Sequence, residues 1–310
     1  MSVKQTRLSR STKMAAYPDG QYIRALFDFT RHRPSDPGST NVHFGDVFRL
    51  LDTTQSASSW IAERIAPSPS DVLEAFGEGG DLLEETTAIP SERWLQSNLP
   101  GGAYAMVTPK ILPYVRPVLI IGAFKDRLST YLLERYPQNY AIAVAHTSRP
   151  AQQGELHGVD YYFVTRAVIE GLRDNGAFVE LGAFNEHLYG TTEGSIREVA
   201  QRQRKRCLLD VSTEAVTRLI TRGLHPIIIL VKPDSVDELR HSDAAYAVSE
   251  VAEHEYMNAV VAHRKLADHV TATVSGQSFD RVLRKVDTLI RVHSVDDVIW
   301  SRVQTSISIT

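Results

Sequence analysis

Residues 118–130 read VLIIGAFKDRLST, four apolar residues followed by a glycine and then by a polar stretch. A short, continuous apolar run is typical of a strand buried on both faces of a parallel sheet. The glycine after it favours a tight turn, and the stretch beginning near Asp126 has the spacing of a helix. The segment therefore predicts a strand, a glycine turn and a helix in immediate succession.

The same layout carries the phosphate-binding P-loop, whose pattern is G-x-x-x-x-G-K-[ST]. In that loop the glycines let backbone N–H groups approach phosphate, and the lysine neutralises the transferred charge. Gly122 and Ser129 stand in place, but Arg127 replaces the second glycine and Leu128 replaces the lysine. Lys125 lies three positions early, and we expect it on the loop rather than at the helix start.

Losing such electrostatic stabilisation usually costs orders of magnitude in rate. We therefore expect a P-loop-like frame that binds no ATP, and we expect no cofactor, no metal and no catalytic residues.

The pattern extends downstream, where apolar runs alternate with helical stretches. This alternation indicates an α/β domain with a mainly parallel sheet. Strands are predicted at 118–121, 140–144, 208–211 and 226–231, and helices at 126–135, 165–174, 193–204, 213–222, 249–268 and 279–292.

Upstream, residues 22–52 alternate between polar and apolar positions and favour strands, so this half is predicted to be all-β. Residues 66–103 are rich in Pro, Ser, Gly and acidic side chains, a composition that cannot build its own core. We interpret them as a flexible linker, in which residues 72–76 form either a short helix or a mobile loop.

The length and amino-acid composition indicate the number of domains, the class of partner and the redox compartment. A length of 310 residues suggests two domains, and 43% hydrophobic with 23% charged residues is ordinary for a globular protein. A formal net charge of -3 weighs against general binding to nucleic acid. The single cysteine, Cys207, excludes an internal disulfide and fits a reducing compartment.

The first half contains, in this order, Ala25-Leu26-Phe27-Asp28-Phe29, Phe44-Gly45-Asp46-Val47, Trp60 and Ile89-Pro90-Ser91. Through these stretches it resembles a Src-homology-3 domain. In that family, aromatic residues and a Pro-Ser-Asn-Tyr element form a groove for polyproline peptides. Here Ile61 replaces the second tryptophan, and Glu92-Arg93 replace the Asn and Tyr, which weighs against polyproline binding. Phe27, Phe29 and Trp60 then serve the structure, with a working groove as the alternative.

The second half contains the stretches Arg116-Pro117-Val118, Lys125-Asp126-Arg127, His146-Thr147-Ser148-Arg149-Pro150, Gly158-Val159-Asp160-Tyr161-Tyr162-Phe163, Phe178-Val179-Glu180, His187-Leu188-Tyr189-Gly190-Thr191, Leu209-Asp210-Val211 and Val298-Ile299-Trp300. Through these stretches nearly all of residues 116–292 resembles guanylate kinase, and both halves together resemble the disks-large branch of the membrane-associated guanylate-kinase homologues.

The resemblance implies a multidomain chain with an all-β Src-homology-3-like barrel and an α/β guanylate-kinase-like domain. Its expected parts are a disordered lead-in at 1–20, core strands of the barrel at 21–65, the linker at 66–103, a further strand and connector at 104–114, the kinase-like domain at 115–296 and a strand returning to the barrel at 297–304.

The resemblance also implies a binding pocket. Arg149, Tyr161 and Tyr189 match residues that hold the GMP phosphate in the enzymes, while Gln152 stands where the second arginine is expected. Around them the resemblance places Glu155, Glu180, Gly190, Thr191 and Asp210, with Leu181 and Phe184 as apolar contacts of a peptide. The structural alternative is that Arg149 pairs internally with Glu180 or Asp210 and the tyrosines only pack the fold.

The expected function is a non-catalytic scaffold that binds a phosphoserine, phosphothreonine or acidic peptide of an adaptor protein in the former GMP pocket, with weak or no GMP binding. Such a module is expected in the cytoplasm, at the cell cortex or junctions, and at membranes only through partners. The alternatives are a residual guanylate kinase and a purely structural scaffold with an empty pocket.

Overall fold

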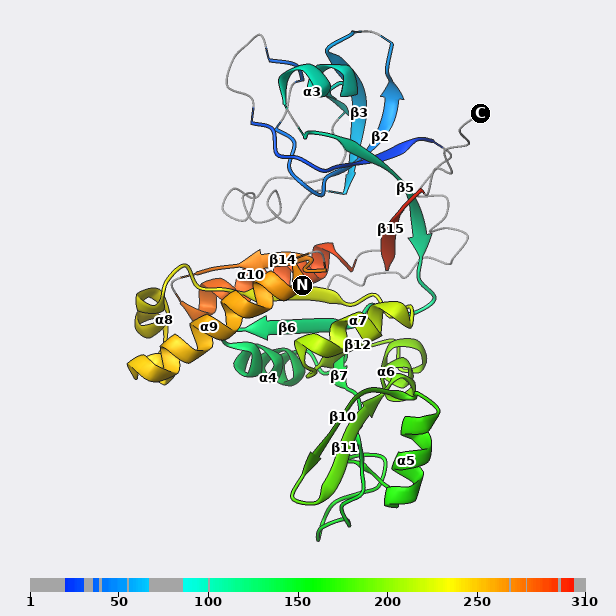
Figure 1. Cartoon of the computed structure of the whole chain (residues 1–310), viewed down its shortest axis with the longest axis vertical. Coiled ribbons are helices and arrows are strands. Elements are labelled where there is room, and N and C mark those ends of the chain that lie inside the picture. Colours follow the sequence, from blue (N-terminus) through cyan, green and yellow to red (C-terminus); the bar gives the residue numbers. More distant parts are fainter. Residues whose placement is uncertain are drawn as a thin grey trace. The chain divides into compact units, whose positions relative to one another are not determined.

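The computed structural model describes residues 20–30, 36–38, 41–54, 56–66, 86–99, 101–267, 269–276, 278–294 and 297–303. The chain divides into two compact units, which we call the β unit (Met1–Ile111 with Val298–Thr310) and the α/β unit (Leu112–Asp297) (Figure 1). Nearly all of the expected lead-in and the uncertain helix at 72–76 lie outside the described residues.

The β unit contains a six-stranded antiparallel sheet in the order β15-β5-β1-β2-β3-β4. Its strands are β1 (Tyr22–Ala25), β2 (Val47–Asp52), β3 (Ser59–Ala66), β4 (Thr86–Pro90), β5 (Tyr104–Ile111) and β15 (Val298–Arg302). The all-β prediction for this half is confirmed. Strand β15 comes from the far side of the α/β unit in sequence and pairs along β5, from Val298 opposite Ile111 to Arg302 opposite Val107.

Part of the span that we expected to be linker is regular structure. Strand β4 pairs with β3, and helix α3 (Glu92–Asn98) follows it directly. The Ser91 side chain caps this helix by accepting a hydrogen bond of 3.1 Å from the backbone N–H of Trp94. Ile89 and Leu95 are fully buried, so these few apolar residues anchor a segment whose average composition is polar.

The aromatic residues of the β unit pack in its core. Phe27 and Phe29 are only 7% and 8% exposed. The Phe29 ring meets Trp94 edge-on at 5.5 Å, and the Phe27 ring meets Tyr104 at 5.1 Å. Trp60 lies 5.7 Å from Tyr104. Helix α3 therefore covers an aromatic surface that would otherwise be open, in agreement with the structural interpretation of these side chains.

The α/β unit is built on a five-stranded parallel sheet in the order β14-β13-β6-β12-β7. Its strands are β6 (Val118–Gly122), β7 (Tyr140–Ile142), β12 (Arg206–Leu209), β13 (Ile227–Val231) and β14 (Ala272–Val274). The α/β prediction is confirmed. Every residue of β13 is buried, as its continuous apolar sequence requires. The strand predicted at 140–144 ends early, at Ile142.

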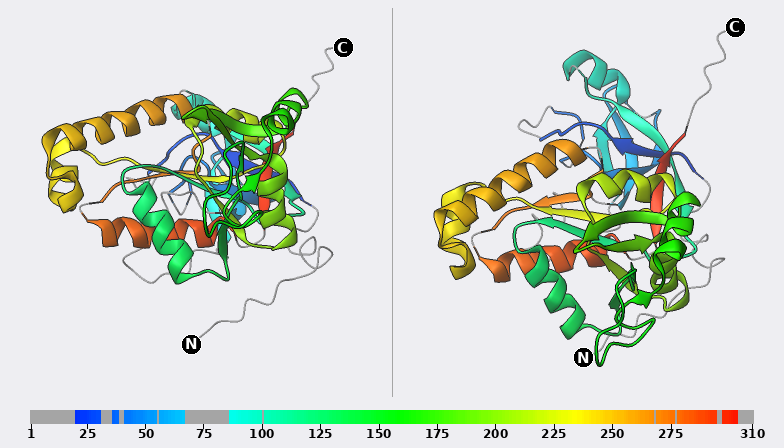
Figure 2. Two further views of the ribbon diagram at one scale, coloured as in Figure 1. Left: turned by 90° about the horizontal axis from the view of Figure 1, so that it is seen from below. Right: turned by 60° about the horizontal axis from the view of Figure 1, so that its bottom comes forward.

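Helices cover both faces of this sheet, with α9 on one side and α4 and α10 on the other (Figure 2). The helices of the unit are α4 (Lys125–Arg135), α5 (Arg166–Asp174), α6 (Glu193–Arg197), α7 (Thr213–Thr221), α8 (Val236–Ser242), α9 (Ser249–Leu266) and α10 (Phe279–Val292). The helix predicted at 193–204 is α6 followed by a π-helical turn at Glu198–Arg202.

A second, four-stranded sheet in the order β10-β11-β8-β9 belongs to the same unit. It consists of β8 (His146–Thr147), β9 (Tyr162–Phe163), β10 (Phe178–Phe184) and β11 (His187–Thr192), and helix α5 packs against it. The hairpin between β10 and β11 turns through Asn185 and Glu186, which both have positive φ angles. This small sheet carries most of the expected pocket.

Arg116 fixes the start of the α/β unit. Its guanidinium group donates to three backbone carbonyls, at 2.9 Å to His225, 3.1 Å to Pro226 and 3.3 Å to His293. Burial lowers the pKa of Arg116 to about 10. A charged group at this position is stable because carbonyl oxygens replace its lost hydration.

Candidate functional site

The small sheet brings most of the expected site residues together. Arg149 follows β8, Tyr161 precedes β9, and Tyr189 lies in β11, which pairs with β8. The rings of Tyr161 and Tyr189 meet edge-on with centroids 6.0 Å apart. The guanidinium carbon of Arg149 lies 5.6 Å from the centroid of Tyr161.

Phe163 is a fourth member of this group that the sequence did not indicate. The guanidinium carbon of Arg149 lies 5.6 Å from its ring centroid, and its ring is 5.8 Å from that of Tyr161. An aromatic ring beside a guanidinium adds cation–π attraction and restricts the arginine side chain. Arg149 is therefore held in place by rings, with its side chain only 17% exposed.

The register between β10 and β11 shows which of the expected site residues lie on the same face of the small sheet as Tyr189. Glu180 pairs with Thr191, and Gly182 pairs with Tyr189, so Glu180, Thr191 and Tyr189 face the same side of the sheet. Leu181 pairs with Gly190 and faces the side of the sheet opposite to Glu180, Thr191 and Tyr189. Phe184 ends β10 with 68% of its surface exposed, which leaves it open to a partner.

Gly190 is required by packing. A Cβ atom at this position would lie 2.6 Å from two atoms of the Phe178 ring and 2.8 Å from the carbonyl oxygen of Glu180. Any side chain here would push the β10 strand away from β11. The glycine thus contributes to the site through close strand packing rather than through ligand contact.

Arg149 forms a bidentate ion pair with Glu155. Its Nη1 atom donates to Oε2 at 2.9 Å, and its Nη2 atom donates to Oε1 at 2.8 Å. The hydrogen bonds with Glu155 raise the pKa of Arg149, and the same contact lowers the pKa of Glu155. The structural alternative from the sequence named Glu180 or Asp210 as the partner of Arg149, and the partner is instead Glu155.

The other polar residues of the expected site have separate partners. Gln152 is exposed, and its backbone N–H donates to Oε2 of Glu155 at 2.6 Å. Glu180 accepts a hydrogen bond of 3.0 Å from the backbone N–H of Ser212. Asp210 forms an ion pair of 3.1 Å with Lys125, the first residue of α4.

The region that corresponds to the P-loop is short. Helix α4 begins at Lys125, so only Ala123 and Phe124 separate it from Gly122, and Phe124 adopts a left-handed conformation with φ of 63°. Our expectation that Lys125 lies on the loop was wrong, because the early helix start places it in the first turn. Leu128 lies in α4 with no exposed surface and belongs to the core.

Side chains from the segment after α8 lie over this short loop. Arg127 pairs with Asp243, and its guanidinium carbon lies 3.7 Å from the centroid of Phe279. The backbone N–H of Phe124 donates to the hydroxyl oxygen of Tyr246 at 2.9 Å. A cavity of about 420 Å³ remains here, lined in part by Lys125. The backbone N–H of Phe124, two residues after Gly122, thus already has an acceptor within the protein.

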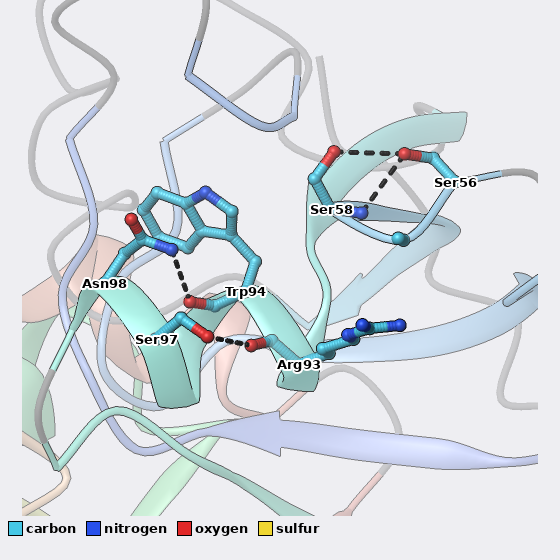
Figure 3. A pocket seen from close by; sticks show the side chains of 7 residues that line it. Ser56, Ser58, Arg93, Trp94, Ser97 and Asn98 are labelled. Carbon is cyan, nitrogen blue, oxygen red and sulfur yellow. Dashed lines mark hydrogen bonds between the residues drawn. The ribbon is translucent and has the colours of Figure 1, made fainter.

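A smaller pocket of about 250 Å³ lies in the β unit between the turn after β2 and helix α3 (Figure 3). The serine and asparagine side chains that line it bond within their own segments. Ser97 and Asn98 bond to backbone carbonyls one turn earlier in α3, at 3.2 and 2.9 Å, and Ser56 contacts Ser58 at 3.0 Å. This pocket has no convergent group comparable to Arg149 and its tyrosines.

Within the described part of the chain, no group of three or more His, Cys, Asp or Glu residues is arranged to hold a metal ion. Among the same residues, no helix has the length and apolar character needed to cross a membrane.

Comparison with known proteins agrees with this geometry. A family model described as guanylate kinase matches residues 114–293. Disks large homolog 4 of Danio rerio is 34% identical over 295 residues and covers 88% of this chain, which spans 35% of the length of that relative. Disks large homolog 3 of Homo sapiens is 31% identical over 305 residues, with 88% of this chain and 37% of the relative covered.

A solved structure of the SH3-kinase fragment of tight junction protein 3 in apo form is 23% identical and covers 92% of this chain and 100% of its own, with a TM-score of 0.41. The chain spans about a third of the length of the curated relatives described above. The family model covers more than half of the chain, which therefore belongs to the guanylate kinase family and has the disks-large arrangement of a Src-homology-3 unit joined to a guanylate-kinase-like unit.

Proposed function

We propose that this chain is a non-catalytic scaffold module that binds a serine- or threonine-containing peptide of a partner protein, phosphorylated or acidic, in the former GMP pocket. The observation that carries the proposal is the convergence of Arg149, Tyr161 and Tyr189 on one small sheet. A guanidinium with phenol groups beside it suits a hydrogen-bonding or anionic side chain. The exposed Phe184 adds an apolar contact at the hairpin end of the same sheet.

The P-loop region supports the non-catalytic part of the proposal. The lysine position is the buried Leu128, and the loop amide of Phe124 already bonds to Tyr246. Lys125, in the first turn of α4, pairs with Asp210. A bound triphosphate would have to replace these contacts without the glycine and lysine that normally receive it.

The partners we propose are adaptor proteins at the cytoplasmic cortex or at cell junctions, with membrane association through those partners. This part of the proposal rests on the similarity to the disks-large homologues, which match 88% of this chain.

Isothermal titration of the full chain with matched serine and phosphoserine peptides, selected from a peptide array, tests the proposal. We expect Arg149→Ala to abolish binding, because it removes the central donor. Arg173→Ala is the matched control, since Arg173 lies in the same unit, is exposed and pairs only with the adjacent Asp174 among the described residues. Equal affinities for wild type and Arg149→Ala would favour the purely structural alternative.

A coupled ADP-release assay with ATP and GMP tests for residual kinase activity. We expect no turnover, and a rate above about 1 per second, within the ordinary range of enzymes, would contradict the non-catalytic assignment.

A further inference from the structure

Three arginines lie on one face of the sheet in the β unit. Arg49 of β2 is directly opposite Tyr22 of β1, and Arg24 lies two positions after Tyr22. Arg302 of β15 is opposite Val107 of β5, and Val107 is opposite Tyr22. Side chains directly opposite each other, or two positions apart on a strand, point to the same side of a sheet. We call Arg24, Arg49 and Arg302 the arginine cluster.

The arginine cluster has more positive charge than its neighbours neutralise. Arg49 forms an ion pair with Glu63 of β3, its register partner. Among the described residues, neither Arg24 nor Arg302 has an ion pair or hydrogen bond from its guanidinium group. The Nε atoms of Arg24 and Arg49 are buried, and neither has a hydrogen-bond partner in the described part of the chain. Since buried polar atoms are normally hydrogen-bonded, these donors point to a ligand.

The charge of Arg24 is costly to the free protein. Burial lowers the pKa of Arg24, and the nearby charge of Arg302 lowers it further. A guanidinium nevertheless stays protonated at neutral pH, and a partly buried charge without a partner destabilises a fold. The aliphatic stem of Arg24 covers part of an apolar face that includes Tyr22 and Val107. A methionine would cover it without this cost, so packing alone does not explain the arginine.

We propose that the arginine cluster is a second binding site, for an acidic peptide segment of a partner protein. It goes beyond the proposed function and does not depend on it, because that function concerns a pocket in the α/β unit. Arg24 and Arg49 are diagonal neighbours, whose Cα atoms are ~7–8 Å apart in an antiparallel pair. Arg302 lies one strand further away, across β5. A single carboxylate or phosphate cannot span this spread, whereas a segment with several Asp or Glu side chains offers an anion to each arginine.

Partial burial of the cluster favours a peptide over a lipid surface. Arg24 and Arg49 are only partly exposed, with 25% of the Arg49 side chain accessible. A membrane attracts basic side chains that reach its headgroups, which half-buried ones do less well. A peptide side chain is narrow enough to reach between neighbouring strands. Ala105, directly opposite Arg24 on β5, is small and partly exposed, and it lies between Arg24 and the strand of Arg302.

The test measures binding of a fluorescent oligoglutamate peptide to the full chain by anisotropy. Arg24→Met removes the charge and keeps most of the stem, and Arg302→Gln removes an exposed charge. We expect each to weaken binding by about fivefold or more, and added salt to weaken binding to wild type. Each variant is also combined with Arg149→Ala, so that any binding at the pocket of the α/β unit is separated from the signal.

Two more variants sharpen the result. Glu63→Gln should strengthen binding by about threefold or more, because it releases Arg49 and removes a repelling carboxylate. Arg93→Gln is the matched control and should bind as wild type does. Arg93 is an exposed arginine of the same unit, but it belongs to α3, whose Leu95 packs with Ile23 on the other face of the sheet.

Urea unfolding followed by tryptophan fluorescence separates recognition from a structural role. Trp300 reports on this face, since its ring centroid lies 5.2 Å from that of Tyr22. Because Arg24 has no anionic partner to lose, Arg24→Met should leave the urea midpoint unchanged or raise it. A lower midpoint would show that the charge stabilises the fold itself and would overturn the assignment of Arg24 to a ligand.

Other outcomes also decide the proposal. Wild-type affinity for oligoglutamate in both Arg24→Met and Arg302→Gln overturns it, as does an equal loss of affinity in Arg93→Gln. Binding to phosphatidylserine-containing vesicles that depends on Arg24, without binding of oligoglutamate, assigns the cluster to a lipid surface instead. None of these results changes the test of the peptide pocket at Arg149, which has its own variants and ligands.

Discussion

Replacing Leu128 by lysine would restore the residue that the P-loop pattern requires, and we expect it to unfold the α/β unit rather than to restore nucleotide binding. Leu128 has no exposed surface and lies in the first turns of α4. Truncating a buried leucine to alanine costs about 2–5 kcal/mol. A buried lysine adds an electrostatic cost, because burial lowers its pKa by ~3–5 units. At pH 7 this cost is roughly 4–5 kcal/mol at about 1.4 kcal/mol per unit, since only the interval between pH 7 and the unfolded value of about 10.4 counts.

The pH dependence identifies the cause. The folded-state pKa of a buried lysine lies below its unfolded value of about 10.4, so the unfolded chain binds more protons between these two values. The loss of stability is therefore fully present below the folded-state pKa and shrinks as pH rises toward about 10.4. We expect the deficit in unfolding free energy of Leu128→Lys to be smaller at pH 10 than at pH 7.

Urea unfolding followed by circular dichroism at 222 nm is the suitable assay, because the long described helices belong to the α/β unit. The tryptophans, Trp60, Trp94 and Trp300, all lie in the β unit, and their fluorescence reports on that unit separately. Leu128→Met is the control, since volume-conserving apolar replacements cost less than about 1.5 kcal/mol. The reasoning is refuted if Leu128→Lys unfolds at the wild-type urea concentration and is stabilised by ATP with magnesium.

Three further outcomes follow from single contacts. Tyr246→Phe should speed hydrogen exchange at the Phe124 amide and cost about 1 kcal/mol, because that amide loses its acceptor; unchanged exchange would show that another group satisfies it. Gly190→Ala should lower the free energy of unfolding by about 1–3 kcal/mol through overpacking against the adjacent phenylalanine ring, as urea titration can measure. Arg116→Lys should cost about 2–4 kcal/mol in the same titration, because an ammonium group cannot reach all three carbonyls, and wild-type stability would contradict this account.

The parallel sheet was predictable because its strands carry a direct signal. Strands β6 and β13 are continuous apolar runs, and every residue of β13 is buried. Helices α4, α7, α9 and α10 likewise follow the predicted ranges to within a few residues. Burial on both faces leaves a sequence pattern that does not depend on any distant contact.

Two strands of the small sheet, β8 and β9, were not predicted because they have two residues each and contain polar side chains. Strands β10 and β11, of seven and six residues, were not predicted either. The first two are strands only through pairing with distant segments, as between Tyr189 and Thr147. Helix α8 was missed for a related reason, since Leu239 is its only buried residue. Short elements of this kind give no periodicity to detect.

The residues of the candidate site could be named from the sequence, but the contacts between them could not. Resemblance named Arg149, Tyr161 and Tyr189, and the structure brings them together. It did not indicate Phe163, nor that Glu155 would face Arg149, because that pair lies six positions apart in a loop and no regular spacing links them. The opposite orientation of Leu181 became visible only from the strand register.

The pairing of β15 with β5 has a consequence for synthesis of the chain. The ribosome makes all of Leu112–Asp297 between these two strands, which takes roughly ten to forty seconds at ~5–20 residues per second. During that interval the free edge of β5 has backbone groups without their final partner, and such an edge can recruit other chains. The sheet of the β unit is therefore completed only after the whole α/β unit has been translated. Until β15 is made, the exposed edge of β5 must be kept from pairing with other chains.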